Sequence, residues 1–156
     1  MSALPDPADA TLPEADRREL IVWTAACATR LLPVFAEDRP DDPRLRDALD
    51  GALAFSRGEL GVGAVRELAF GCHAAARDAA SSAATAAARA CGQAVAVAHM
   101  AGHSRHVPAY AAKALPARDL RDAELVWQRS TVPARFAVYV YGPRARPVAT
   151  LTAPDD

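Results

Sequence analysis

Apolar side chains recur at steps of three and four residues along most of the chain, which is the spacing of one face of an α-helix. The first segment with this spacing contains Leu20, Trp23, Cys27, Leu31 and Val34. It predicts a helix that begins near Thr11 and Glu14, whose spacing is that of a capping box, and ends before Glu37. Residues 1–12 are rich in proline, aspartate and alanine, and we expect them to be a flexible lead-in.

Two further amphipathic segments follow. Asp41 or Asp42 is suited to cap a second helix with Pro43 in its first turn, and Gly58 is suited to end that helix in the left-handed conformation. A third helix is predicted after Gly63. Its apolar face contains Val65, Ala69, Cys72 and Ala76, and its second face contains Arg66, Phe70, His73 and Arg77.

The next helix is unusually rich in alanine. Ser81 or Ser82 is suited to cap it. A seam of small side chains, along which helix axes can approach closely, contains Ala84, Ala88, Cys91, Val95, Ala98 and Gly102. Pro108 lacks a backbone donor and clashes with the preceding turn, so it must interrupt, kink or restart this helix, and residues 110–115 are expected to form a separate short one.

The last elements are less regular. Residues 119–132 have helical spacing and end at Pro133. Residues 135–141 have the propensity of a strand, but a lone strand has no partner in this chain, so we expect a short helix. The chain is therefore predicted to be all-α: a single compact bundle of about five to seven helices over residues 13–141, with a long alanine-rich central helix and an irregular tail over residues 142–156.

Composition and charge make some classes of binding partner less expected than others. The formal net charge is −1 at pH 7, so nucleic acid and membrane are not expected partners. Residues 79–118 nevertheless contain no acidic residue, which makes them a candidate surface for an anionic ligand or an acidic partner. Three cysteines without metal-finger spacing, and an N-terminus without the pattern of a signal peptide, predict a reduced, cytoplasmic protein. Small-residue seams also allow a homodimer.

The densest polar pattern consists of His99, His103, His106, Tyr110 and Lys113, at steps of four, three, four and three. His99 and His103 have a spacing that lets two imidazoles bind one metal, but the glutamate of an HExxH motif is absent. Histidines that hydrogen-bond within a helix seam are the more frequent arrangement, and no cofactor is predicted. Arg77 is expected to pair with Asp78 or with a carboxylate of the first two helices, or alternatively to face an anion. No catalytic motif is found in the sequence, so an enzyme is not expected.

Several stretches, taken together, carry a resemblance over about residues 17–136. In the first half they contain Trp23, Cys27, Arg30, Pro33, Phe35, Asp42, Arg44, Phe55, Arg57 and Gly58. In the second half they contain His73, Arg77, Asp78, His99, Gly102, His103, Tyr110, Lys113, Trp127, Gln128 and Pro133. In this pattern the chain resembles a bacterial family of immunity proteins that belong to polymorphic toxin systems.

The resemblance implies a non-enzymatic, all-helical protein that binds a cognate toxin and occludes its active site. Two charged stretches are candidate binding faces: the acidic residues 37–50 and the basic residues 89–118. Candidate contact residues are Arg57, His73, Arg77, His99, His103, Tyr110 and Lys113. The alternative hypothesis is a helical protein that binds a metal or small ligand through a seam lined by histidines.

Overall fold

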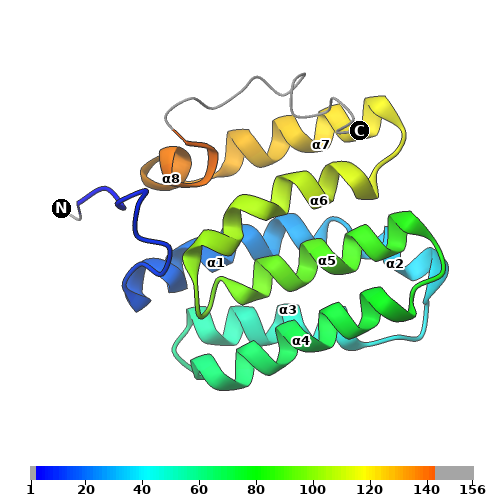
Figure 1. Cartoon of the computed structure of the whole chain (residues 1–156), viewed down its shortest axis with the longest axis horizontal. Coiled ribbons are helices and arrows are strands. Elements are labelled where there is room, and N and C mark those ends of the chain that lie inside the picture. Colours follow the sequence, from blue (N-terminus) through cyan, green and yellow to red (C-terminus); the bar gives the residue numbers. More distant parts are fainter. Residues whose placement is uncertain (1–2, 143–156) are drawn as a thin grey trace.

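Eight α-helices and two short 3-10 helices make up the regular structure of residues 3–142, which are the residues described by the computed structural model (Figure 1). No strand occurs among these residues, so the all-α prediction is confirmed. The elements are α1 (Glu14–Thr29), α2 (Leu32–Asp38), α3 (Arg44–Ser56), α4 (Val62–Asp78), α5 (Ser82–Ala96), η1 (Ala101–His106), α6 (Val107–Ala114), α7 (Arg118–Thr131), η2 (Ala134–Phe136) and α8 (Ala137–Tyr141).

The alanine-rich helix α5 is the centre of the bundle. It packs against α1, α2, α3, α4 and α6, and ten of its fifteen residues are buried. Most of those ten are alanines, whose small side chains let the neighbouring helices come close to its axis. In Figure 1, α4, α5, α6 and α7 follow one another from bottom to top on the near side, with α1, α2 and α3 behind them.

The predicted first helix is in fact two helices. α1 ends at Thr29 and α2 begins at Leu32, with a bend of 45° between them. Pro33 lies in the first turn of α2, and a proline there cannot continue the hydrogen-bond ladder of α1. Within the described residues no single helix is long and apolar enough to cross a membrane; α1 and α2 meet that requirement only as a bent pair.

The sequence signals for helix ends have mixed outcomes. The hydroxyl of Ser81 accepts a hydrogen bond from the backbone N–H of Ala84 at 3.0 Å, and Gly58 has a φ of 74°, so both predictions are confirmed. The capping box at Thr11 is wrong, because Pro13 is the N-cap of α1 and no side chain caps that helix.

The segment before α1 contains no helix and lies against the C-terminal half of the chain. The carbonyl of Ala10 accepts a hydrogen bond from the N–H of Gly102 at 2.8 Å, and the hydroxyl of Tyr139 donates to the carbonyl of Asp9 at 2.7 Å. Tyr139 belongs to α8, so the predicted short helix near residues 135–141 is confirmed. The predicted irregular tail lies, from residue 143 onward, outside the described residues.

Contacts between α1 and α7 join the first and last long helices. The indole N–H of Trp23 donates to the carbonyl of Gln128 at 3.2 Å, and Arg30 pairs with Glu124 at 2.8 Å. The Arg30 guanidinium also lies 4.0 Å from the centroid of the Trp127 ring. Trp23 is buried, whereas Trp127 is only half-buried.

Candidate functional site

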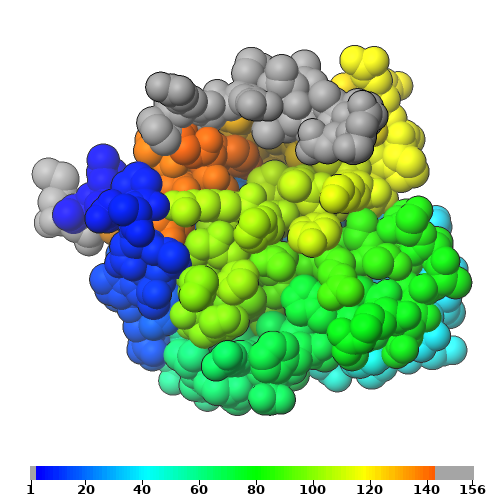
Figure 2. Space-filling view, in the orientation of Figure 1, coloured from blue at the N-terminus to red at the C-terminus, as the bar shows by residue number. Residues whose placement is uncertain are grey.

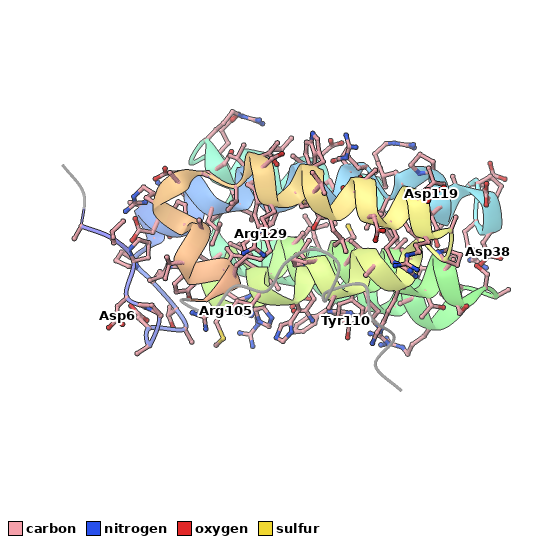
Figure 3. All side chains as sticks on the ribbon, turned by 90° about the horizontal axis from the view of Figure 1, so that it is seen from above. Asp6, Asp38, Arg105, Tyr110, Asp119 and Arg129 are labelled. Carbon is pink, nitrogen blue, oxygen red and sulfur yellow. The ribbon has the colours of Figure 1, made fainter. Side chains whose placement is uncertain are left out.

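Four elements, α4, α5, η1 and α6, present cationic and aromatic side chains on one side of the bundle. Figure 2 shows this side, where α4 and α5 are green and η1 and α6 are yellow-green. In Figure 3 it is the lower edge, along which Tyr110 and Arg105 are labelled. We call it the basic face and define it by residues that interact with one another or line one groove: Arg66, Phe70, His73, Arg77, Arg89, His99, His103, His106, Tyr110 and Lys113.

The basic face begins where α4 meets α5, at His73. The ring Nδ1 of His73 is 2.9 Å from Nη1 of Arg89 on α5. An arginine can only donate, so Nδ1 accepts this hydrogen bond and His73 is neutral. Burial lowers the pKa of His73, and the charges of Arg89 and Arg77 lower it further. A neutral imidazole therefore positions Arg89 without cancelling its charge.

Two further histidines, His99 and His103, lie next along the face. The rings of His99 and His103 meet edge to face with centroids 5.0 Å apart, and Nδ1 of His103 is 2.8 Å from Oε1 of Gln93. Because the Gln93 oxygen can only accept, Nδ1 of His103 carries a hydrogen. Burial is the main cause that lowers the pKa of both histidines. The charge of Arg66 lowers the pKa of His99 further, and electrostatic repulsion between the two imidazoles when both are protonated lowers that of His103.

An open groove of about 720 Å³ lies at the other end of the basic face, between α5 and α6. Its lining is Ala80, Ser81, Ser82, Thr85, Ala86, Arg89, Tyr110 and Lys113. The ammonium of Lys113 lies 5.5 Å from the centroid of the Tyr110 ring. The groove therefore combines two cations and one aromatic ring, and none of the residues 3–142 that line it is acidic.

The cations of the basic face differ from most arginines elsewhere in the bundle. Elsewhere, arginines form ion pairs with carboxylates, including Arg18 with Glu14, Arg30 with Glu124, Arg44 with Asp42, Arg57 with Glu59, and Arg135 with Asp16. Arg66, Arg77, Arg89 and Lys113 have no carboxylate of residues 3–142 within ion-pairing distance. This face thus has positive charge that the described part of the bundle does not neutralise.

The structure brings six of the seven candidate contact residues onto this face and separates the seventh. Arg57 is at the C-terminal end of α3 and forms a close ion pair with Glu59. Arg77 pairs with no carboxylate of residues 3–142, and the Asp78 carboxylate is bound by Arg44 at 2.8 Å. The exposed Arg77 is instead part of the basic face.

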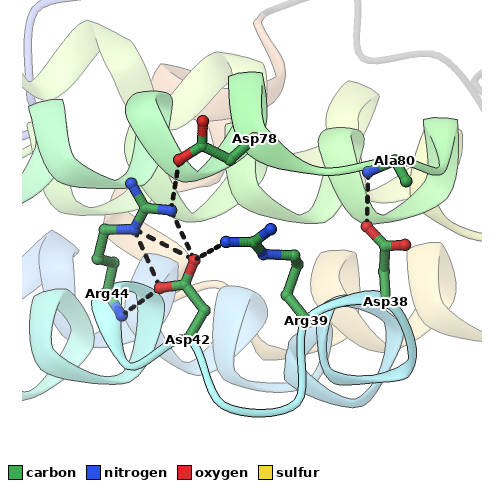
Figure 4. Close-up of polar contacts among 6 residues, drawn as sticks. All are labelled: Asp38, Arg39, Asp42, Arg44, Asp78 and Ala80. Carbon is green, nitrogen blue, oxygen red and sulfur yellow. Dashed lines mark hydrogen bonds and ion pairs between the residues drawn. The ribbon is translucent and has the colours of Figure 1, made fainter.

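Several side chains of the other candidate face, the acidic residues 37–50, form contacts that stabilise the fold (Figure 4). The Asp42 carboxylate is 6% exposed and binds Arg44 at 2.6 Å, and Asp38 accepts a hydrogen bond from the N–H of Ala80 at 2.7 Å. Hydrogen bonds from Arg44 hold the pKa of Asp42 below its ordinary value. These contacts tie the α2–α3 connection to the end of α4 and the start of α5.

A metal site has no support in the geometry of the described residues. Residues 3–142 contain no group of three or more histidine, cysteine or carboxylate side chains arranged to hold a metal ion. Nδ1 of His73 accepts a hydrogen bond from Arg89, and Nδ1 of His103 donates one to Gln93. Two of the histidines thus form hydrogen bonds within a helix seam, whereas Nδ1 of His99 is buried and has no hydrogen-bond partner among the described residues.

Sequence reasoning missed the groove, although its cations stand in the stretch without acidic residues. Arg89 and Lys113 are far apart along the chain, and only the alignment of α5 with α6 brings them into one lining. The i, i+3, i+4 pattern of α4 did identify Arg66 and Phe70 as members of one face with His73.

Comparison with known protein families finds a match over most of the chain. The model of the Imm-5 like putative immunity protein family matches residues 10–135. No curated protein and no solved structure matches the chain. The matched range includes all four elements of the basic face. The chain therefore belongs to the Imm-5 like immunity protein family.

Proposed function

We propose that this protein neutralises a bacterial toxin by binding directly to it through the basic face, and that it acts by occlusion without a catalytic step. One observation carries the proposal: Arg66, Arg77, Arg89 and Lys113 share one face and have no carboxylate partner in the described bundle. A patch of like charge steers a partner of opposite charge and fixes the register of the complex.

The partner that fits this face is a protein with an acidic patch. Phe70 is 52% exposed with the Arg66 guanidinium 5.7 Å from its ring centroid, and Tyr110 lies beside Lys113. Aromatic and arginine side chains are the residues most enriched at the energetic centre of protein interfaces. The family supports the role of an immunity protein, and the basic face supports an acidic toxin surface as its target.

We place this activity in the cytoplasm. The three cysteines, Cys27, Cys72 and Cys91, are buried and free, and the sulfurs of Cys72 and Cys91 are 3.5 Å apart. Thiols this close favour a reducing compartment, where disulfides are rare. Fractionation of the native host, with detection of the protein beside a cytoplasmic marker, tests this placement.

The direct test is co-expression with the proteins encoded next to the gene. We expect one of them to arrest growth when expressed alone, to be tolerated when this protein is present, and to purify with it in a fixed stoichiometry. Affinity is expected to fall as salt is raised, because exposed charges are screened. If this protein is folded and neither suppresses nor binds any neighbouring toxin, the proposal is wrong.

A matched pair of variants assigns binding to the face. Arg77→Glu and Arg46→Glu make the same charge change at two exposed arginines on neighbouring helices, and neither arginine pairs with a carboxylate of residues 3–142. Only Arg77 belongs to the basic face. Arg77→Glu is expected to weaken toxin binding, whereas equal effects of the two substitutions would show that net charge alone determines affinity.

A further inference from the structure

We infer that the groove between α5 and α6 is the part of the basic face that receives an acidic side chain of the toxin, with its carboxylate bound between Arg89 and Lys113. This inference rests on the proposed function and specifies its contact. The segment that enters the groove is a short part of the partner protein that carries an aspartate or glutamate.

The size and lining of the groove suit a segment of a few side chains. Its volume of about 720 Å³ is within the range of roughly 300–1,000 Å³ that is common for binding sites. Ala80, Ala86 and the ring of Tyr110 supply apolar surface, and Ser82 and Thr85 supply hydroxyl groups. Among the described residues of the lining, the charged atoms belong to Arg89 and Lys113.

Arg89 is held in place without being neutralised. One of its terminal nitrogens donates to Nδ1 of His73, which lies against the backbone of Gly92. The guanidinium keeps its other N–H groups for a ligand, because a neutral imidazole occupies only one of its five donors. A fixed guanidinium loses less conformational entropy when it binds a carboxylate than a freely rotating one does.

Lys113 is positioned by an aromatic ring. Its ammonium lies 5.5 Å from the centroid of Tyr110, a cation–π distance, and no carboxylate of residues 3–142 is in contact with it. Two cations in one lining that pair with no carboxylate of residues 3–142 repel each other, and an anionic group between them removes that repulsion. Charge complementarity therefore selects a carboxylate from among protein side chains.

Lys113 is the only lysine among the 156 residues, which permits a test at a single atom. A carbodiimide activates a carboxyl group, the amine of Lys113 attacks it, an amide bond forms, and the carbodiimide leaves as the corresponding urea. Because this reaction adds no spacer, it joins only groups that are already in contact. The probe is the purified complex with the toxin identified by co-expression, and mass spectrometry locates the linked residues.

We expect an amide between Lys113 and an aspartate or glutamate of the toxin. Lys113→Arg keeps the positive charge but removes the amine, so the cross-link must disappear in that variant. Lys113→Glu is expected to raise the dissociation constant by about tenfold or more, as is usual when one member of a close interfacial charge pair is reversed. Arg46→Glu is the control for a change of net charge outside the face.

The outcomes separate this inference from the proposed function. If the complex does not form with the unaltered protein, the proposed function fails. If the complex forms but Lys113 is not cross-linked, or if Lys113→Glu binds within threefold of the unaltered protein, the carboxylate contact is wrong and the proposed function stands. Substitution of the cross-linked toxin carboxylate by lysine should restore binding to Lys113→Glu, and failure of this reciprocal exchange would also overturn the contact.

Discussion

The imidazole of His73 on α4 occupies the space directly above Gly92 on α5. Its Cε1, Nε2 and Nδ1 atoms are 2.6, 2.7 and 3.1 Å from the position that a Cβ atom on Gly92 would take. The ring can approach the helix this closely only because residue 92 has no side chain. The same position brings Nδ1 within 2.9 Å of Arg89, so Gly92 indirectly positions a cation of the basic face.

Gly92→Ala should destabilise the protein by about 1–3 kcal/mol, because a methyl group would overlap the His73 ring. The better helix propensity of alanine, worth roughly 1 kcal/mol, offsets part of this loss. Chemical denaturation followed by circular dichroism measures the change. Gly71→Ala on α4 is the control: nothing lies within 4 Å of its added Cβ, so this variant should gain stability.

A double variant tests whether the His73 ring causes the loss. In His73→Ala the space above residue 92 is empty, so adding Gly92→Ala to it should cost less than Gly92→Ala costs alone. The stability of the four proteins forms a double-mutant cycle, and the expected coupling is favourable. Strict additivity would contradict the close contact between this ring and α5.

Acid should destabilise the protein in a window that begins near neutral pH. The folded state holds the pKa values of His73, His99 and His103 below their ordinary value, which is about 6.5. As the pH falls below about 6.5, the unfolded chain therefore binds protons before the folded chain does, and the free energy of unfolding decreases. This part of the stability is complete above that pH and is lost as the pH falls toward the folded pKa values.

Urea unfolding at pH 7.5 and pH 5.5 measures this window. His103→Gln removes one of the three groups while leaving a side chain that can hydrogen-bond to Gln93, so the difference between the two pH values should shrink. An unchanged difference would mean that His103 takes up protons equally in both states.

Arg44→Met should destabilise the protein by roughly 1–3 kcal/mol, since it leaves the nearly buried Asp42 carboxylate without its main partner. Arg39, 3.7 Å from Asp42, compensates only in part. The control is Arg46→Met on the same helix, where an exposed arginine without a carboxylate partner in the described bundle should change stability by less than about 0.5 kcal/mol. Equal losses in the two variants would mean that the Asp42 contact contributes nothing.

Ser81→Ala should cost about 1 kcal/mol, because the Ser81 hydroxyl accepts the Ala84 N–H at the start of the central helix. Ser82→Ala removes the hydroxyl of the next residue, which is not the cap, and should have a much smaller effect. Thermal unfolding of the two variants compares them directly, and a larger loss for Ser82→Ala would contradict the assignment of the cap.

The features predicted from the sequence are those set by nearby residues. The four-residue periodicity of α4, the Ser81 cap, the turn at Gly58 and the new helix with Pro108 in its first turn depend on a few neighbouring side chains and on backbone stereochemistry. The alanine-rich helix itself ends earlier than predicted, at Ala96, so Ala98 and Gly102 of the predicted seam lie beyond it. The helix predicted near residues 135–141 is also confirmed, and that prediction depends on the absence of a partner strand rather than on local propensity.

The features that sequence reasoning missed depend on contacts between distant segments. Thr11 has the right spacing for a cap, but its carbonyl and that of Ala10 accept hydrogen bonds from Ala101 and Gly102, which places this segment against η1 instead. Trp127 is half-buried with Arg30 over its ring, in a contact between residues almost one hundred positions apart. Neither arrangement leaves a signal in the local pattern.

The candidate site was predicted in part for the same reason. The residues of each helix face were identified because helical spacing is local. Their union into one basic face, and the groove shared by Arg89 and Lys113, require the alignment of α4, α5 and α6. Arg57 was included only through the family resemblance, and the structure places it at the end of α3, away from the face.

The alanine content of α5 has a consequence for how this protein can diverge. The buried positions of α5 are alanine, glycine, cysteine and valine, so nearly any larger residue would overpack the bundle, and this helix must change slowly. The exposed Arg66, Arg77 and Lys113 carry no such constraint, unlike the half-buried Arg89, which is hydrogen-bonded to His73 on α4. If that face binds the toxin, substitutions of these exposed residues can adapt the protein to changes in the toxin, while the buried helices stay the same.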